Sequence, residues 1–161
     1  MPSVPALLLI LAACCMIPIL TAGAISDLKT RTFPKSYWKG NVLVPAAFVM
    51  FQYLVMIMAG EFYMIGLSII IAITSGLSCA FMGLRYGSGG DWRALMYIGI
   101  ISPLLMLPTV VLSLIVGLVI VIFEYGMLPK GTNPLKVTIP FAVAILAGYV
   151  GSLLIFIYTN W

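Results

Sequence analysis

The chain has 161 residues, of which 63% are hydrophobic and 7% charged, and its formal net charge is +4. A soluble domain is about 45–50% apolar and about 25% charged, so this composition excludes a soluble globular enzyme, a disordered tail and a nucleic-acid-binding module. The chain has no histidine, which excludes Ser-His-Asp and Cys-His catalysis, and no CxxC pair that would mark a zinc site. We therefore expect one all-α, polytopic membrane domain, 1–161, with no large soluble part, no metal, no cofactor and no nucleic-acid partner.

The first apolar run, 4–26, contains no ionisable side chain. No Lys or Arg precedes it and four follow it between 27 and 39, and it is too long for the apolar region of a cleaved signal peptide. We therefore expect it to remain in the protein as the first membrane span. The basic segment after it marks the cytoplasmic side by the positive-inside rule.

Of the later charge-free stretches, 94–123 is long for one span and short for two at about 1.5 Å per residue. Pro103 and Pro108 lie near its middle, and proline removes helix hydrogen bonds and can turn the chain. Six spans with the N-terminus outside place all eight Lys and Arg on the cytoplasmic side, whereas five would move Lys130 and Lys136 outside. We therefore predict six transmembrane helices and an N-out/C-out topology. The predicted spans are 4–26, 41–60, 62–84, 92–106, 108–125 and 138–159.

The chain contains two aspartates. The topology places Asp27 at the cytoplasmic end of the first span and Asp91 at the cytoplasmic start of the fourth, so both lie at one depth on one face. Two close carboxylates tend to share one proton, and such a pair can activate water while hydrogen-bonding a scissile carbonyl. The simpler alternatives are a juxtamembrane charge for Asp27 and a helix N-cap for Asp91.

A run of small residues, Gly87-Ser88-Gly89-Gly90, precedes Asp91. Glycine lets another chain approach the backbone closely and adopts positive φ, which is more than an N-cap needs. The Gly-Lys-Ser/Thr sequence of a phosphate-binding loop is absent. We expect a loop that leaves room for an extended peptide and holds the two carboxylates apart until substrate closes the site.

Two segments carry a family resemblance. The sequence Asp-Leu-Lys-Thr-Arg-Thr-Phe-Pro at 27–34, which contains Arg31 and Pro34, resembles the first aspartate motif of the type IV prepilin peptidases. The sequence Gly89-Gly90-Asp91 resembles their second motif, Gly-x-Gly-Asp, which gives the GxGD aspartyl proteases their name.

A third segment, Ile139-Pro140-Phe141, resembles the start of that family's last span, so the three matches run in the family's order from 27 to 141. The chain departs from the strict second motif because Ser88 stands where glycine is expected and the glycine is displaced to Gly87. The short length and six predicted spans are most similar to the archaeal preflagellin and prepilin peptidases.

The resemblance implies an aspartyl endopeptidase of the cell membrane that removes the class III signal peptide from type IV pilin-like or archaellin precursors. Asp27 and Asp91 would be its catalytic residues, at the cytoplasmic face. The precursors would be its partners, together with membrane lipids whose headgroups contact Lys29, Arg31 and Lys35. The bacterial members' cysteine-rich domain is missing, so we expect no methyltransferase activity. The sequence leaves open the precursor, the protonated aspartate and the oligomeric state.

Three other functions remain as alternatives. A presenilin-like intramembrane protease would carry Tyr-Asp and Pro-Ala-Leu motifs, but Ser26 precedes Asp27 and no Pro-Ala-Leu is present. A small proton-coupled transporter or channel would use Asp27 and Asp91 as relays, although such sites lie near the bilayer midplane. A non-catalytic scaffold would tolerate substitution of both aspartates.

The small residues Gly76, Ala80 and Gly83 share one face of the third predicted span. We expect this face to serve close helix packing within the protein, with docking of a substrate helix as the alternative. Of the two glutamates, Glu61 is predicted on the far side of the membrane. Glu124 is predicted on the cytoplasmic side, as a solvated interfacial charge, with a part in the site as the minor alternative.

Overall fold

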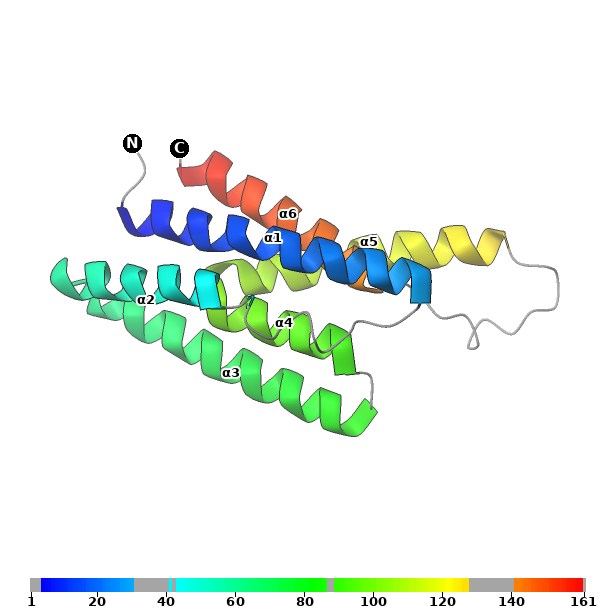
Figure 1. The fold of residues 1–161 in the computed structure, drawn as a ribbon, viewed down its shortest axis with the longest axis horizontal. Helices are drawn as coiled ribbons and strands as arrows, with labels where there is room; N and C mark the ends of the chain where they lie inside the picture. Colours follow the sequence, from blue (N-terminus) through cyan, green and yellow to red (C-terminus); the bar gives the residue numbers. More distant parts are fainter. Residues whose placement is uncertain (1–3, 31–40, 42, 87–88, 128–140, 161) are drawn as a thin grey trace.

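The computed structural model describes residues 4–30, 41, 43–86, 89–127 and 141–160, except for the side chains of residues 80 and 82–90. As expected, the described part of the chain is all-α, and it contains six helices (Figure 1). They are α1 (Val4–Thr30), α2 (Leu43–Met58), α3 (Phe62–Tyr86), α4 (Gly89–Ile101), α5 (Pro103–Gly126) and α6 (Phe141–Asn160).

Consecutive helices run in opposite directions along one long axis (Figure 1). The two chain termini lie at one end of the molecule, on the left of the view. The end of α1, the junction between α3 and α4 and the end of α5 all lie toward the other end, on the right. We call this other end, which carries Asp27, Asp91 and Glu124, the aspartate end.

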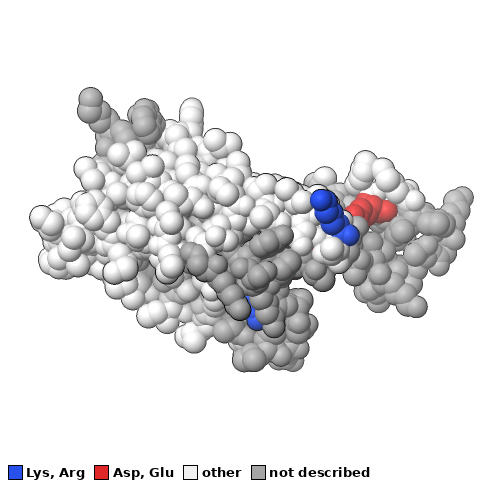
Figure 2. All heavy atoms as spheres, viewed as in Figure 1, with Lys and Arg blue, Asp and Glu red and all other residues white. Residues whose placement is uncertain are grey.

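Four helices are long and apolar enough to cross a membrane, namely α1, α5, α6 and the Phe62–Cys79 part of α3. The protein is therefore a multi-pass membrane protein without a large soluble domain. Large apolar side chains cover the outer surface of α2, α3 and α5, as at Met50, Ile70 and Leu114. In Figure 2 the visible charged side chains lie at the middle of the molecule and toward the aspartate end, and the described surface near the termini is uncharged on this face.

The predicted break in the stretch 94–123 exists, but its position was wrong. We expected spans at 92–106 and 108–125, whereas α4 ends at Ile101 and α5 begins at Pro103. Proline lacks an N–H and has a fixed φ, so it suits the first position of a helix. Pro103 takes that position, and Pro108 lies inside α5.

Ser102, the single residue between α4 and α5, is fully buried. Its N–H donates to the Ile98 carbonyl at 2.7 Å, and its carbonyl accepts from the Leu105 N–H at 2.9 Å. Its hydroxyl lies 2.9 Å from the Tyr149 hydroxyl of α6. These bonds satisfy the polar groups of the break inside an apolar region, where an unpaired group is costly.

The core is formed mainly by α1, α4 and α6. Met16, Ile98 and Ile145, one from each helix, are fully buried and belong to one apolar cluster. The helices α2, α3 and α5 pack around this centre, with α5 against α6, α3 against α4, and α2 against α1. Both aspartates therefore lie on central helices, Asp27 on α1 and Asp91 on α4.

Glycines show where helices pack closely. A Cβ on Gly148 of α6 would collide with Ser113 and with the Thr109 carbonyl of α5, so these helices approach backbone to backbone. By contrast, nothing lies within 4 Å of a Cβ placed on Gly76. The expectation that the Gly76 face serves close packing was therefore wrong at Gly76, because α3 turns that position away from its neighbours. The side chain of Ala80 and the surroundings of Gly83 lie outside the described part.

Gly148→Ala should destabilise the fold, because the methyl group would have to displace backbone atoms of α5 rather than a flexible side chain. We expect a loss of about 1–3 kcal/mol, typical of overpacking. Gly76→Ala is the matched control, since it adds the same methyl group to an open helix surface and should leave stability unchanged or slightly raised. Thermal unfolding of both variants in one detergent measures the difference, and equal effects would contradict the packing described.

Candidate active site

Asp27 lies in the last turn of α1 and is buried, with 7% of its surface exposed. Its Oδ2 atom accepts a hydrogen bond of 3.1 Å from the backbone N–H of Ala142. Since α6 begins at Phe141, this N–H is one of the first-turn donors that have no partner within their own helix. The partial positive charge of a helix N-terminus stabilises a negative carboxylate. Asp27 thus caps α6 from a different helix, and it is not a solvated juxtamembrane charge.

Asp91 is the third residue of α4 and is partly buried. It lies ahead of the apolar part of that helix. Burial, and after it the negative charge of Asp27, raise the pKa of its carboxyl from 3.8 to about 6. The two aspartates are therefore close enough to interact electrostatically. Among the described side chains, no hydrogen bond joins the two carboxylates directly.

The placement of α4 corrects two expectations about the glycine run. Gly89 and Gly90 form the start of α4 rather than a loop, and Asp91 lies inside the first turn rather than at the N-cap. The physical reason is that an acidic side chain in the first turn is favoured by the helix dipole, so the helix can begin before Asp91. Several other predicted residues lie outside the described part: Arg31, Pro34, Gly87, Ser88 and Pro140.

The raised pKa of Asp91 predicts a dependence of stability on pH. The folded protein keeps this proton up to about pH 6, whereas the unfolded chain releases it near its ordinary value of 3.8. Between these values the folded state binds more protons, so its stability falls as the pH rises. We expect the thermal midpoint in detergent to fall from about pH 4 to about pH 6. Asp91→Asn should lack this part of the slope, and a variant with an unchanged slope would contradict the raised pKa.

Three other charged side chains that the structure describes lie toward this end. Lys29 lies in the last turn of α1, Arg93 is partly buried in α4, and Glu124 is in the last turn of α5. Glu61 lies at the connection of α2 to α3, away from the aspartates. The described residues contain no cluster of three or more metal-binding side chains.

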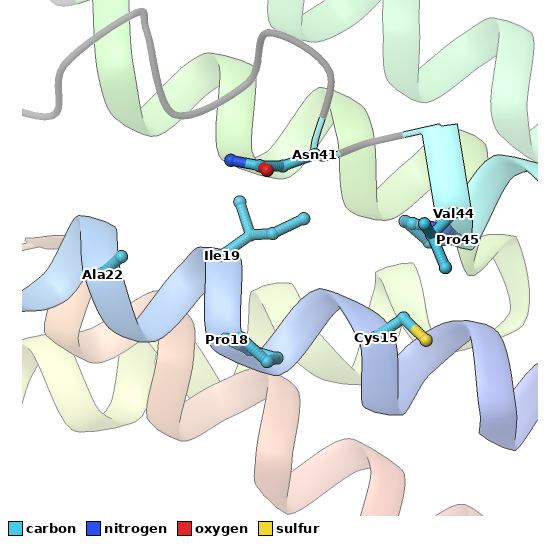
Figure 3. Close-up of a pocket in the computed structure, with 7 residues that line it drawn as sticks. All are labelled: Cys15, Pro18, Ile19, Ala22, Asn41, Val44 and Pro45. Carbon is cyan, nitrogen blue, oxygen red and sulfur yellow. The ribbon is translucent and has the colours of Figure 1, made fainter.

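A cavity of about 390 Å³ lies between α1 and α2 (Figure 3). Ile19 of α1 and Asn41, just ahead of α2, face each other across it, and Cys15 and Val44 line its other part. Its lining is mostly apolar. Ala22, one of its lining residues, precedes Asp27 by five residues on the same helix, about 7.5 Å along α1.

Sequence reasoning missed the role of Ala142. Its backbone N–H holds Asp27 across a separation of 115 residues. The Ile139-Pro140-Phe141 sequence was a usable signal, because proline favours a helix start and therefore places unpaired N–H groups just after it. Nothing in the sequence showed which side chain those groups would meet.

Comparisons of the chain with family models, with curated proteins and with solved structures gave no match. The resemblance to the type IV prepilin peptidases therefore rests on the motifs quoted above. The function has to be argued from the two aspartates and their surroundings.

Proposed function

We propose that this protein is a membrane-embedded aspartyl endopeptidase that removes the signal peptide from type IV pilin-like or archaellin precursors. One observation carries the proposal. The chain has two aspartates, 27 and 91, and the pKa of Asp91 is raised first by burial and then by the negative charge of Asp27. A carboxyl that keeps a proton near neutral pH beside a second carboxylate is the arrangement that acid–base hydrolysis needs.

The surroundings of the aspartates support hydrolysis rather than transport. Both residues lie near helix ends, Asp27 three residues before the end of α1 and Asp91 three residues into α4. Transport sites are usually found near the bilayer midplane on broken helices. The break between α4 and α5 is such a place, but Ser102 and Tyr149 are the polar groups there and neither is charged.

The apolar surfaces suit a substrate with a membrane helix. A precursor of this class has a short basic segment, a scissile bond and then an apolar helix that remains in the mature subunit. The helix would dock from the lipid side, with the scissile bond at the aspartate end. The apolar cavity between α1 and α2 and the open face of α3 at Gly76 are the two candidate docking surfaces.

We further propose that all six helices cross the membrane, with both termini outside and the aspartates on the cytoplasmic side. The alternating directions of the helices support this topology (Figure 1). The helix α4 has 13 residues, which at 1.5 Å per residue is about 20 Å. Local thinning of the bilayer can accommodate such a short helix, at a cost of a fraction of a kcal/mol per Å of mismatch.

Cysteine labelling tests the topology. In a background with Cys14, Cys15 and Cys79 replaced by serine, Trp161→Cys should react with a membrane-impermeant maleimide on intact cells. Ser36→Cys should react only after the membrane is permeabilised. The opposite pattern would place the aspartates outside and overturn the assignment.

A reconstituted cleavage assay tests the function. The purified protein in liposomes is mixed with pilin-like and archaellin precursors, and mass spectrometry identifies the fragments. We expect one cut between the basic segment and the apolar helix. A precursor whose residues flanking the bond are replaced should stay intact. If the folded protein cuts none of the precursors, the peptidase proposal fails, and proton flux across the same liposomes then tests the transporter alternative.

A further inference from the structure

The two aspartates have unequal surroundings. Asp27 is 7% exposed and accepts a hydrogen bond from the Ala142 N–H. Asp91 is more exposed and accepts no hydrogen bond from any residue that the structure describes. A carboxylate that is buried must have its charge balanced by donors, and within the described part of the chain only Asp27 of the two has such a donor.

The donor to Asp27 is a backbone N–H in the first turn of a helix. Ala142 is the second residue of α6, so its N–H has no acceptor in its own helix and points out of the first turn. Hydrogen bonds from such groups to an ionised oxygen are stronger than those between neutral groups. The helix N-terminus also adds a fixed partial positive charge. Both effects favour the ionised form of the side chain that receives the bond.

We propose that the first turn of α6 assigns fixed roles to the two aspartates: the Ala142 N–H holds Asp27 as the ionised carboxylate, and Asp91 carries the proton. The catalytic meaning of these roles rests on the proposed peptidase function, whereas the charge asymmetry itself does not. Ala142 is a positioning residue, since it acts on Asp27 and not on the substrate.

The roles give a balanced reaction. Asp27 accepts a proton from water while the water oxygen bonds to the scissile carbonyl carbon, and Asp91 donates its proton to the carbonyl oxygen. In the resulting tetrahedral diol, Asp27 gives its proton to the leaving nitrogen as the carbon–nitrogen bond breaks. One diol hydroxyl returns a proton to Asp91. Both side chains then have their starting protonation.

The charged groups that the structure describes do not remove the asymmetry. The described charged groups on the packed elements are Lys29 on α1, Arg93 on α4 and Glu124 at the end of α5, while the first turn of α6 carries none. The causes that set the pKa of Asp91 are burial first and the charge of Asp27 second, and no cation is among them.

The presence of only two aspartates makes the assignment directly measurable. Protein labelled with ¹³C at the aspartate carboxyl carbon should give two signals, which Asp27→Asn and Asp91→Asn assign. We expect the Asp91 signal to titrate with a midpoint near pH 6, while the Asp27 signal stays at the position of an ionised carboxylate. If Asp27 titrates there and Asp91 stays ionised, or if both stay ionised, the proposal is overturned.

A pair of proline variants tests the role of Ala142. Ala142→Pro removes the N–H that Asp27 accepts, and proline is tolerated in the first turn of a helix. Val143→Pro is the matched control, because it makes a similar change one residue later and keeps the Ala142 N–H. We expect the Asp27 signal to begin titrating in Ala142→Pro alone. Identical titrations in the two variants would contradict the positioning role.

Cleavage by the same variants separates the two proposals. Ala142→Pro should lose about 100-fold in rate, as for removal of one preorganised donor, with a shifted pH profile, while Val143→Pro keeps most activity. Unequal titrations without any cleavage would leave the asymmetry standing and remove the peptidase function. Cleavage without unequal titrations would support the peptidase function and remove the charge asymmetry.

Discussion

Asp27→Asn and Asp91→Asn are each expected to reduce precursor cleavage by about 100-fold to 10,000-fold, the usual contribution of a positioned acid or base. The amide keeps the size of the carboxyl group but cannot accept a proton from water or donate one to a carbonyl oxygen as an acid. In Asp27→Asn the amide oxygen can still accept the Ala142 N–H. The loss should therefore come from chemistry and not from unfolding. Single-turnover rates on a cleavable precursor measure it.

Glu124→Gln is the matched control for these variants. It removes an acidic group at the same end of the molecule, in the last turn of α5, and should cleave at close to the unmodified rate. Asp27→Ala should behave differently from Asp27→Asn, since it leaves the buried Ala142 N–H without its acceptor and lowers stability as well. An Asp→Asn variant that cleaves as fast as the unmodified protein would rule out a two-aspartate mechanism.

The cleavage rate is also expected to fall as the pH rises above about 6. The pKa of Asp91 is raised to about 6 by burial and by the charge of Asp27, so its proton-bearing form predominates below that value. Above it, the fraction that can donate a proton falls tenfold for each pH unit. We therefore expect log(kcat/KM) to decline with a slope of about −1 from about pH 6 upward.

A pH series in one lipid and buffer system measures this slope. Protein that is returned to about pH 6 after incubation at about pH 8 should regain its full rate, which separates titration from irreversible unfolding. A rate that rises between these values would mean that Asp91 acts in its ionised form, and would reverse the roles proposed for the two side chains.

Most of the helices were predictable because each is a long apolar run and charged residues separate the runs, whereas α4 and α5 share one charge-free stretch. The position of the turn between α4 and α5 was harder. Pro103 and Pro108 are both compatible with a helix start, and local sequence does not choose between them. The choice depends on Ser102, whose hydroxyl meets Tyr149 in a helix 47 residues away. Contacts of that kind are set by packing and are invisible in a single sequence.

The candidate site, too, could be predicted from the sequence only in part. The positive-inside rule placed Asp27 and Asp91 at one end without any structural information. It did not reveal that Asp27 would be buried against α6, because that burial needs the first turn of α6 beside the last turn of α1. Two glycines show most plainly that a single sequence does not reveal which positions pack closely. Gly76 and Gly148 are both small residues in apolar helices, yet only Gly148 meets a neighbouring backbone.

The bond between Ser102 and Tyr149 has a mechanical consequence. Tyr149 follows Ala142 by seven residues, about two turns or 10 Å along α6. The helix α6 is therefore hydrogen-bonded to α1 through Ala142 and to Ser102, at the end of α4, through Tyr149. The two bonds lie at different heights along α6. Rotation of α6 about its own axis would break both hydrogen bonds together. The rotation of α6 is therefore fixed relative to both α1 and the end of α4.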